Sequence, residues 1–330
     1  MSPLSTSSDG AVAPQGQHQS EEVGIPSLTL PEHDVRHPAD SAQGRRSRKT
    51  ALFFTAPTWA LIVPVAAIPL LIGVWLSFRD QMLGSASPTS FVGLANYQSD
   101  VLNPTFGQAL IVTLTIVAIG LLIQIPLGLL LAVLLNRRIR GARFFRSSLI
   151  TPMLLTPVAV GLMWRFMFNS ELGVVNWFIG SVGLPSVDWL GESTPALFAV
   201  VIVDSWQAIP FVMLMMLAGL AALPTSPAEA ASVDGASSWQ AFRYVTLPML
   251  APVLLVTLMV RLIDGFKLFD IVFILTRGGP GTATQTVSML DYNTAFTFLA
   301  SSRAAAIGTV LALLTLPVYW LWVRASRGIE

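Results

Sequence analysis

Four charged residues recur at every third position inside an otherwise apolar stretch in the last third of the chain: Arg261, Asp264, Lys267 and Asp270. A charge at the centre of a bilayer costs about 2.5–3.5 kcal/mol on insertion scales, so such residues need a partner or water. Neighbours three apart on one helix can pair. The charges either neutralise one another inside a helix bundle or line a water-filled path, and Arg261 and Asp270 could reach the interfaces if they lie near the helix ends.

A second polar group, Asp204, Ser205 and Gln207, lies ahead of Pro210. A buried Asp in a membrane span is a functional candidate by default. The alternatives are a hydrogen bond between packed helices or a position near the outer interface, and Gln124 is a weaker candidate of the same packing kind. The candidate residues of a translocation path are therefore Asp204, Gln207, Asp264, Lys267 and Asp270.

The sequence lacks the residues that disulfides, metal sites and nucleotide-binding sites require. The sequence has no cysteine, and its three histidines, His18, His33 and His37, lie near the amino terminus, which excludes disulfides, Cys-bound metals and a His-built site in the body. The run Gly278 to Gly281 lacks the Lys-Ser/Thr pair of a P-loop. We expect no catalytic residue, metal or bound cofactor, and any energy from ATP must come from another chain.

The overall composition is that of a membrane protein. Of 330 residues, 53% are hydrophobic and only 11% are charged, against roughly 25% in soluble domains, and the mean hydropathy is +0.67. A spanning helix needs about 20 apolar residues. Six stretches qualify and predict an all-α, polytopic fold: Leu52–Leu76, Phe106–Leu135, Phe144–Phe168, Thr194–Leu220, Met249–Leu275 and Ser302–Val323.

The first 44 residues differ from the rest. They are rich in Ser, Pro, Gln, Gly and acidic residues, which predicts a disordered tail, followed by a membrane domain over 45–330. The first apolar run begins too late for a secretory signal. With a net charge of +1, nucleic acid is not an expected partner.

Lys and Arg in the loops predict the orientation. They gather at 45–49, at 137–146 and after the last span, whereas the loop 169–193 has none. The positive-inside rule places both termini in the cytoplasm. The loop at about 224–248 should also be cytoplasmic, yet it carries Glu229 and Asp234 against Arg243. A partner protein could account for this exception.

That loop contains a distinctive short pattern: Glu229, Ala230, Ala231, Asp234, Gly235 and Ala236, followed by Leu247 and Pro248. Its small residues suit close contact with another protein, and Gly235 can release the backbone between two short helices. A plain inter-helix loop with a C-capping Gly is the alternative. The pattern resembles the EAA loop of ABC importer permeases, which implies the type I permease fold and a short coupling helix that docks on a separate ATPase subunit.

A second stretch, Phe266–Pro280, resembles the end of the fifth span in maltose-transporter-like carbohydrate permeases. The matching residues are Thr276, Gly278, Gly279 and Pro280. The resemblance covers about residues 50–325, and 91–97 and 206–211 also share it. It implies import of a sugar or polyol across the bacterial inner membrane, without bond chemistry in this chain.

The same resemblance implies a set of partners. These are a second permease, two ATPase subunits that carry ATP and Mg, an extracytoplasmic solute-binding protein, and membrane lipid. The external Trp189 could meet the binding protein or the sugar. The alternative function is a stand-alone, ion-coupled secondary transporter that uses Asp204 and the charges of the fifth span. Internal repeats would favour it, and the sequence shows none.

Overall fold

The computed structural model describes residues 40–84, 89–137 and 141–327. The chain divides into two compact units, residues 1–61 and Ile62–Glu330. All contacts discussed below lie within the second unit. Residues 1–39 are outside the described part, so the disordered tail stays a prediction, and α1 begins at Asp40.

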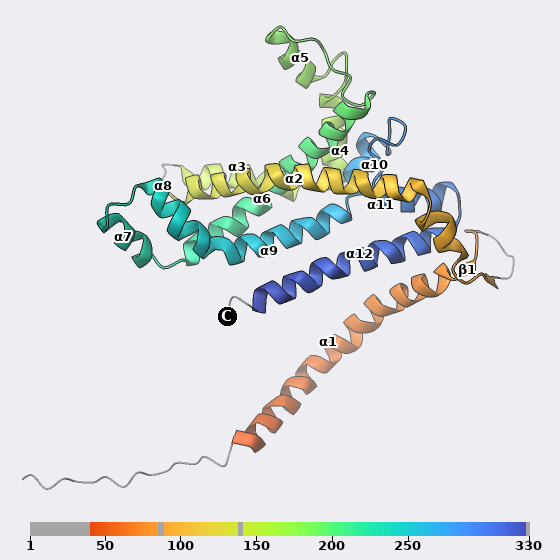
Figure 1. The fold of residues 1–330 in the computed structure, drawn as a ribbon, viewed down its shortest axis with the longest axis horizontal. Helices are drawn as coiled ribbons and strands as arrows, with labels where there is room; N and C mark the ends of the chain where they lie inside the picture. The colour runs from red at the N-terminus through yellow and green to blue at the C-terminus, as the bar shows by residue number, and fades with distance from the viewer. Residues whose placement is uncertain (1–39, 85–88, 138–140, 328–330) are drawn as a thin grey trace, which may run out of the picture. The chain divides into compact units, whose positions relative to one another are not determined.

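The fold is built almost entirely of helices (Figure 1). Its longest elements are α1 (Asp40–Ser77), α2 (Pro104–Asn136), α6 (Ser193–Ala222), α9 (Leu247–Phe266) and α12 (Ser301–Arg327). The shorter α-helices are α3 (Ala142–Leu154), α4 (Pro157–Met167), α5 (Val174–Ser181), α7 (Ser226–Val233), α8 (Ser238–Ala241), α10 (Asp270–Leu275) and α11 (Val287–Tyr292). Three π-helical turns are η1 (Tyr97–Val101), η2 (Phe242–Thr246) and η3 (Asn293–Thr297). Two-residue strands β1 (Arg79–Asp80) and β2 (Ser90–Phe91) pair antiparallel.

The number of membrane spans agrees with the expected six. Five helices in the described residues are long and apolar enough to cross a bilayer, and the bent pair α3 and α4 makes a sixth if it counts as one span. Backbone groups in hydrocarbon must be satisfied within the chain, which the helices achieve. The all-α, polytopic prediction is therefore confirmed.

The third span is broken rather than continuous. α3 and α4 meet at an angle of 97° across Leu155 and Thr156, both of which are extended. Thr156 precedes Pro157, and a residue before proline avoids the helical region. The Thr156 hydroxyl accepts a bond from the Ala159 N–H at 3.4 Å, so it caps α4 while Pro157 occupies the first helical turn.

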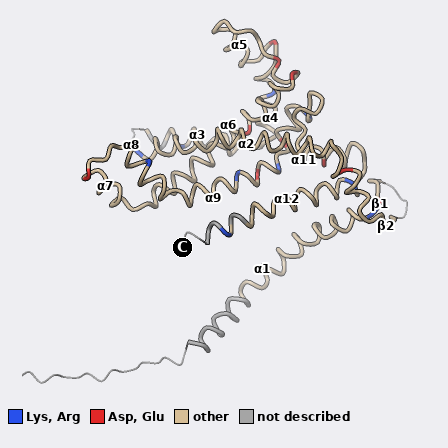
Figure 2. Tube along the Cα trace, in the orientation of Figure 1, with Lys and Arg blue, Asp and Glu red and all other residues tan. Residues whose placement is uncertain are grey.

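The fifth span also differs from the expectation. The predicted helix over Met249–Leu275 is wrong at its end, because α9 stops at Phe266 and α10 begins only at Asp270. The charges expected on one continuous helix therefore lie on both sides of a break. Figure 2 shows both signs of charge along α9.

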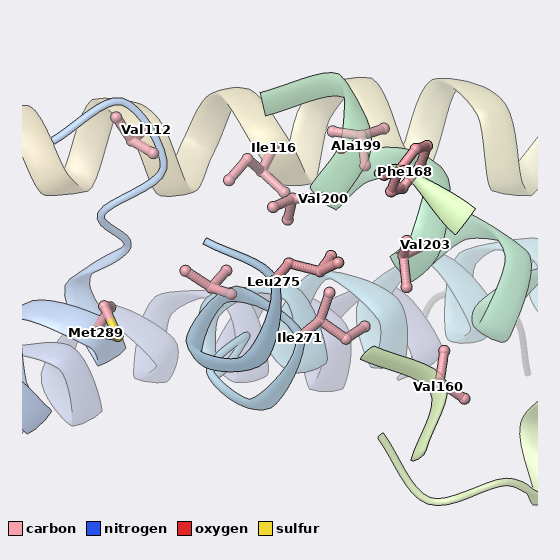
Figure 3. Close-up of a cluster of buried hydrophobic side chains, with 12 residues drawn as sticks. Val112, Ile116, Val160, Phe168, Ala199, Val200, Val203, Ile271, Leu275 and Met289 are labelled. Atoms are coloured by element: carbon pink, nitrogen blue, oxygen red, sulfur yellow. The ribbon is translucent and has the colours of Figure 1, made fainter. Parts of the chain in front are cut away.

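α2 and α6 form the central helix pair (Figure 1). Gly128 of α2 permits their contact, because a Cβ there would lie 2.5 Å from the Val212 side chain. Small residues allow such close approach between membrane helices. A cluster of buried side chains joins this pair to α4 and α10, and Figure 3 shows Ile116, Val203 and Ile271 within it. A second apolar cluster surrounds Val212 and Met216 of α6.

Candidate functional site

A polar network crosses the three central spans. Arg261 on α9 donates to Asp204 on α6, with Nη2 to Oδ2 at 3.1 Å. Gln124 on α2 completes it: its amide nitrogen donates to Asp204 at 2.7 Å, and its Oε1 accepts from Arg261 Nε at 3.0 Å. Ser205 lies 3.3 Å from the same amide nitrogen. The structure thus brings together Asp204 and Arg261, and it makes Gln124 the link between them.

The network is enclosed by the protein. The side chains of Arg261 and Asp204 are only 11% and 16% exposed, and Gln124 is buried. Along α2 and α6 it lies between the two apolar clusters, since Gln124 follows Ile116 and precedes Ala132. Arg261 is paired inside the bundle, so the idea that it reaches the interface is wrong. Charged groups in such surroundings are stable only when they are paired and hydrogen-bonded.

Asp264 lies at the edge of this network. Its Oδ2 is 3.6 Å from Arg261 Nη1, and its side chain is 52% exposed. Arg261 therefore lies between a buried carboxylate and an exposed one. The described contacts include no ion pair between Asp264 and Lys267.

Lys267 and Asp270 border the break in the fifth span, and both are exposed. Lys267 caps the carboxyl end of α9, and Asp270 begins α10. These signs complement the helix dipoles, because a cation is stabilised at a C-terminus and an anion at an N-terminus. The break therefore accounts for two charges that a continuous helix left unexplained.

Side chains from beyond the break satisfy the backbone that it frees. Thr286 Oγ1 donates to the Leu268 carbonyl at 3.0 Å, and Ser288 Oγ donates to the Phe266 carbonyl at 3.2 Å. Thr113 of α2 accepts from the Val287 N–H at 3.0 Å. Irregular backbone at membrane depth needs such partners. The start of α11 therefore supports the interruption directly, and α2 holds α11 in place through Thr113.

Gln207 does not join the network. Its amide nitrogen donates to the Leu155 carbonyl at 3.0 Å. Leu155 caps α3 at the break in the third span. Gln207 therefore satisfies a carbonyl that the break leaves free. Its role differs from that of Asp204, which belongs to the polar network.

The segment Thr276–Pro280 forms a compact loop after α10. Gly278 has a φ of +87°, which favours glycine, and the Gly279–Pro280 peptide bond is cis. Thr284 ties the loop together, because its hydroxyl donates to the Gly279 carbonyl at 2.7 Å and lies 2.7 Å from the Thr276 hydroxyl. The motif thus shapes the chain between α10 and α11.

The loop between α6 and α9 contains the two short helices that Gly235 was expected to separate. α7 ends at Val233 in a Schellman-type C-cap with two backbone hydrogen bonds. The Ala236 N–H donates to the Ala231 carbonyl at 2.9 Å, and the Gly235 N–H donates to the Ser232 carbonyl at 3.2 Å. Gly235 has a φ of +85°, as this cap requires. Apart from its two chain neighbours, no described residue lies within 4 Å of a Cβ placed there, so the glycine serves the turn and leaves the surface open.

α7 presents an exposed surface. Glu229 and Ala230 are exposed, and the Val233 side chain is 87% exposed despite being apolar. Glu229 lies in the first turn of α7, where its charge is favoured by the helix dipole, and no described residue pairs with it. It also borders a cleft of about 300 Å³ with Asn136 and Thr246. α7 therefore offers an acidic and apolar surface that the described residues leave uncovered.

Asp291 is a titratable group that the sequence did not single out. It lies on α11, outside the five long spans. Its Oδ1 is buried and has no hydrogen-bond partner among the described residues. Asp291 also borders an apolar cavity of about 410 Å³ with Gly73 and Gly308. Burial raises the pKa of Asp291 from 3.8 to about 6.

Trp189 is held within this chain. Its indole N–H donates to Asn176 Oδ1 at 3.1 Å, and its ring lies 5.2 Å from that of Phe168. Asn176 also binds the Val187 backbone, so Trp189 helps to fasten the segment around α5 to α4. The described contacts of Trp189 therefore give it a structural role.

Comparison with known proteins identifies the family. Residues 124–329 match the model of the binding-protein-dependent transport system inner membrane component. This chain belongs to that family. The permease is 36% identical over 300 residues to the probable ABC transporter permease protein y4oQ of Sinorhizobium fredii, covering 88% of this chain and 96% of the relative. It is also 36% identical to the trehalose/maltose transport system permease protein MalF of Thermococcus litoralis, covering 75% of this chain and 84% of the relative.

A solved structure shares the permease fold. A chain of a bacterial ABC transporter involved in the import of the acidic polysaccharide alginate superposes with a TM-score of 0.74, covering 88% of this chain and 99% of that one, at 22% identity. The type I permease prediction for the fold is therefore confirmed. Family membership also decides between the two expected functions, in favour of the ABC importer permease and against the secondary transporter.

Proposed function

We propose that this permease forms half of the translocation path of a bacterial importer for a sugar or related polyol. Relatives that match most of the chain carry the names of trehalose and maltose systems, and this observation carries the substrate class. The fifth-span break supplies suitable groups, since Asp264 and Asp270 can accept hydrogen bonds from hydroxyls and Lys267 can donate them. These three exposed residues face the path in this proposal.

The coupling surface is α7 with its glycine cap. Glu229, Val233 and the turn at Gly235 meet a cleft on a separate ATPase subunit. The cap fixes the direction of the chain after α7, so a displacement of α7 is passed through α8 and η2 to α9. ATP and Mg belong to that partner, and this chain catalyses no bond change.

The importer contains two ATPase subunits, a second permease and an extracytoplasmic solute-binding protein. The α12 and α2 ends that carry Arg324 and Arg137 lie on the cytoplasmic side, together with both termini. Asp188 and Gly279 lie outside. ATP-driven movement then changes which side of the path is open.

Uptake by the whole importer tests this function. A deletion strain that lacks the permease should lose growth on one or a few sugars or polyols within a panel of single carbon sources, and plasmid-borne permease should restore it. Affinity purification of the tagged permease should bring down ATPase subunits in stoichiometric amounts. A permease that purifies alone and transports in vesicles without ATP contradicts the proposal.

A further inference from the structure

An apolar groove runs along the last turns of α2 and ends beside α8. Its volume is about 490 Å³. The α2 side is formed by Pro126, Leu129, Leu130, Val133 and Arg137, and the other side includes Trp239 and Phe242. Leu130 is 52% exposed and Trp239 is 69% exposed, so the described chain leaves the groove open.

The groove has the length of one membrane leaflet. Pro126 and Arg137 lie eleven residues apart, which is about 16 Å at roughly 1.5 Å per helical residue. Half of a hydrocarbon core of about 30 Å is about 15 Å. Pro126 follows the buried network residue Gln124, so the groove extends from the middle of the bundle to the end of the span.

A cation stands at the end of the groove. The described contacts give the Arg137 guanidinium no hydrogen bond or ion pair, and the segment 137–146 contains five arginines and no acidic residue. Arg146 of α3 adds a second guanidinium nearby, since it donates to the Leu135 carbonyl at 2.9 Å. Glu229, in the loop between α6 and α9, borders the neighbouring cleft, and no acidic residue lines this groove in the described part of the chain.

The aromatic side chains of Trp239 and Phe242 suit the interfacial end of this groove. Trp239 and Phe242 lie 5.8 Å apart between ring centroids and form the wall opposite α2. Tryptophan favours the membrane interface, where its ring contacts acyl chains and its N–H remains near polar groups. The groove thus combines an apolar channel of leaflet length, a tryptophan suited to the interface and a guanidinium that no described residue pairs with.

We infer that an anionic phospholipid of the cytoplasmic leaflet binds in this groove. One acyl chain lies along Leu129, Leu130 and Val133, and the phosphate accepts hydrogen bonds from Arg137. The inference rests on the proposed orientation, which places Arg137 in the cytoplasmic leaflet. Lipid binding is measured separately from transport, so failure of either proposal is distinguishable.

The site lies beside the coupling surface. Trp239 belongs to α8, which follows directly from the cap of α7 at Gly235. A lipid in the groove would therefore restrain α8 against α2. We expect occupancy to strengthen the link between α7 and the spans, so that anionic lipid raises sugar uptake at a fixed amount of assembled importer.

The binding test uses the purified importer. Native mass spectrometry should show phosphatidylglycerol retained in preference to phosphatidylcholine when each is added at equal concentration. Arg137→Gln should lower phosphatidylglycerol retention about fivefold, as expected for one basic group beside an anionic lipid. Val133→Trp should fill the groove and lower retention of both lipids. Arg324→Gln, which removes a cation at the end of α12, is the matched control and should leave retention unchanged.

The result that overturns the inference is equal retention of the two lipids, or an Arg137→Gln importer that matches Arg324→Gln. Because Val133→Trp could disturb packing, a photo-crosslinking residue at Leu130 provides a second measurement. It should label lipid in the intact importer. Labelling of the ATPase or of the second permease instead shows that protein covers the groove and also overturns the inference.

Discussion

The Arg261 guanidinium on α9 lies 3.1 Å from the Asp204 carboxylate on α6, and the amide of Gln124 on α2 bonds to both. Each residue belongs to a different span, so the three helices are held at one relative depth. The network is enclosed between two apolar clusters. It is therefore better suited to fixing the helix register than to contacting a solute that passes through.

Removing either Asp204 or Arg261 should reduce the amount of stably folded permease. A buried ion pair that loses one partner leaves an uncompensated charge, at a cost of roughly 3–5 kcal/mol. We expect Asp204→Leu and Arg261→Met each to reduce folded permease in membranes several-fold, and the double variant to recover much of it. Fluorescence-detected size-exclusion chromatography measures the folded amount.

Arg303→Gln is the control for that experiment. Arg303 makes bonds of 2.7 Å to Asp100 but is 49% exposed, and exposed pairs contribute about 0–1 kcal/mol. It should leave the folded amount near that of the wild type. Equal losses from Arg303→Gln and Arg261→Met would show that burial does not set the contribution of the pair.

The exposed charges at the fifth-span break should behave differently. Asp264 and Lys267 make no described ion pair with each other, so removing both cannot restore a mutual interaction. We expect Asp264→Asn, Lys267→Met and the double variant to assemble normally and to transport at a small fraction of the wild-type rate. Uptake normalised to assembled importer is the measurement, and near-normal uptake by the double variant would favour simple charge neutralisation.

The sequence indicates the spans and the α7 turn well because both depend on local properties. Apolar length defines a span, and Gly235 alone supplies the positive φ of the cap. The third-span break also has a local signal in Thr156 and Pro157, which a hydropathy count overlooks. Such signals need only neighbouring residues.

The fifth-span break and the polar network are less accessible to sequence reasoning. Thr286 and Ser288 satisfy carbonyls 18 and 22 residues away, and Gln124 meets a residue 137 positions along the chain. Such pairings depend on the relative depth and rotation of the helices, which periodicity within one span does not specify. The sequence alone therefore predicts only a packing role for Gln124.

Asp291 should make stability depend on pH. Burial raises its folded-state pKa to about 6 from 3.8, so between those values the folded protein binds a proton that the unfolded chain has lost. Its contribution to stability consequently falls as pH rises from about 4 to about 6 and then stays constant. We expect Asp291→Asn to raise the apparent melting temperature more at pH 7.5 than at pH 5.

Full ionisation of Asp291 should lower the free energy of unfolding by on the order of 2–3 kcal/mol, at about 1.4 kcal/mol per pKa unit. Melting of the purified importer in detergent at the two pH values provides the measurement. Asp80→Asn, at an exposed position on β1, is the control for a general effect of losing one carboxylate. The same temperature shift for Asp291→Asn at both pH values would contradict the assignment.

The proposed coupling role of α7 can be tested separately from the turn that ends the helix. Glu229→Lys reverses a charge on the exposed first turn and should weaken ATPase attachment without affecting insertion of the spans, because the residue lies in a loop. Glu171→Lys makes the same charge change in the loop between α4 and α6, and it should retain coupling. The assay is uptake together with ATPase stimulation by the loaded binding protein, at matched permease levels.

Substitutions at Gly235 complete the separation. Its φ of +85° is tolerated by Asn, whereas a β-branched residue is strained there by about 1–2 kcal/mol. Within the described part of the chain, a Cβ at this position meets nothing beyond its own neighbours in sequence. If only the turn matters, Gly235→Asn should couple normally and Gly235→Val should not. We expect both to couple poorly, because the proposed coupling surface places the ATPase against the glycine. Wild-type coupling in Gly235→Asn and in Glu229→Lys would remove the basis for a coupling helix at α7.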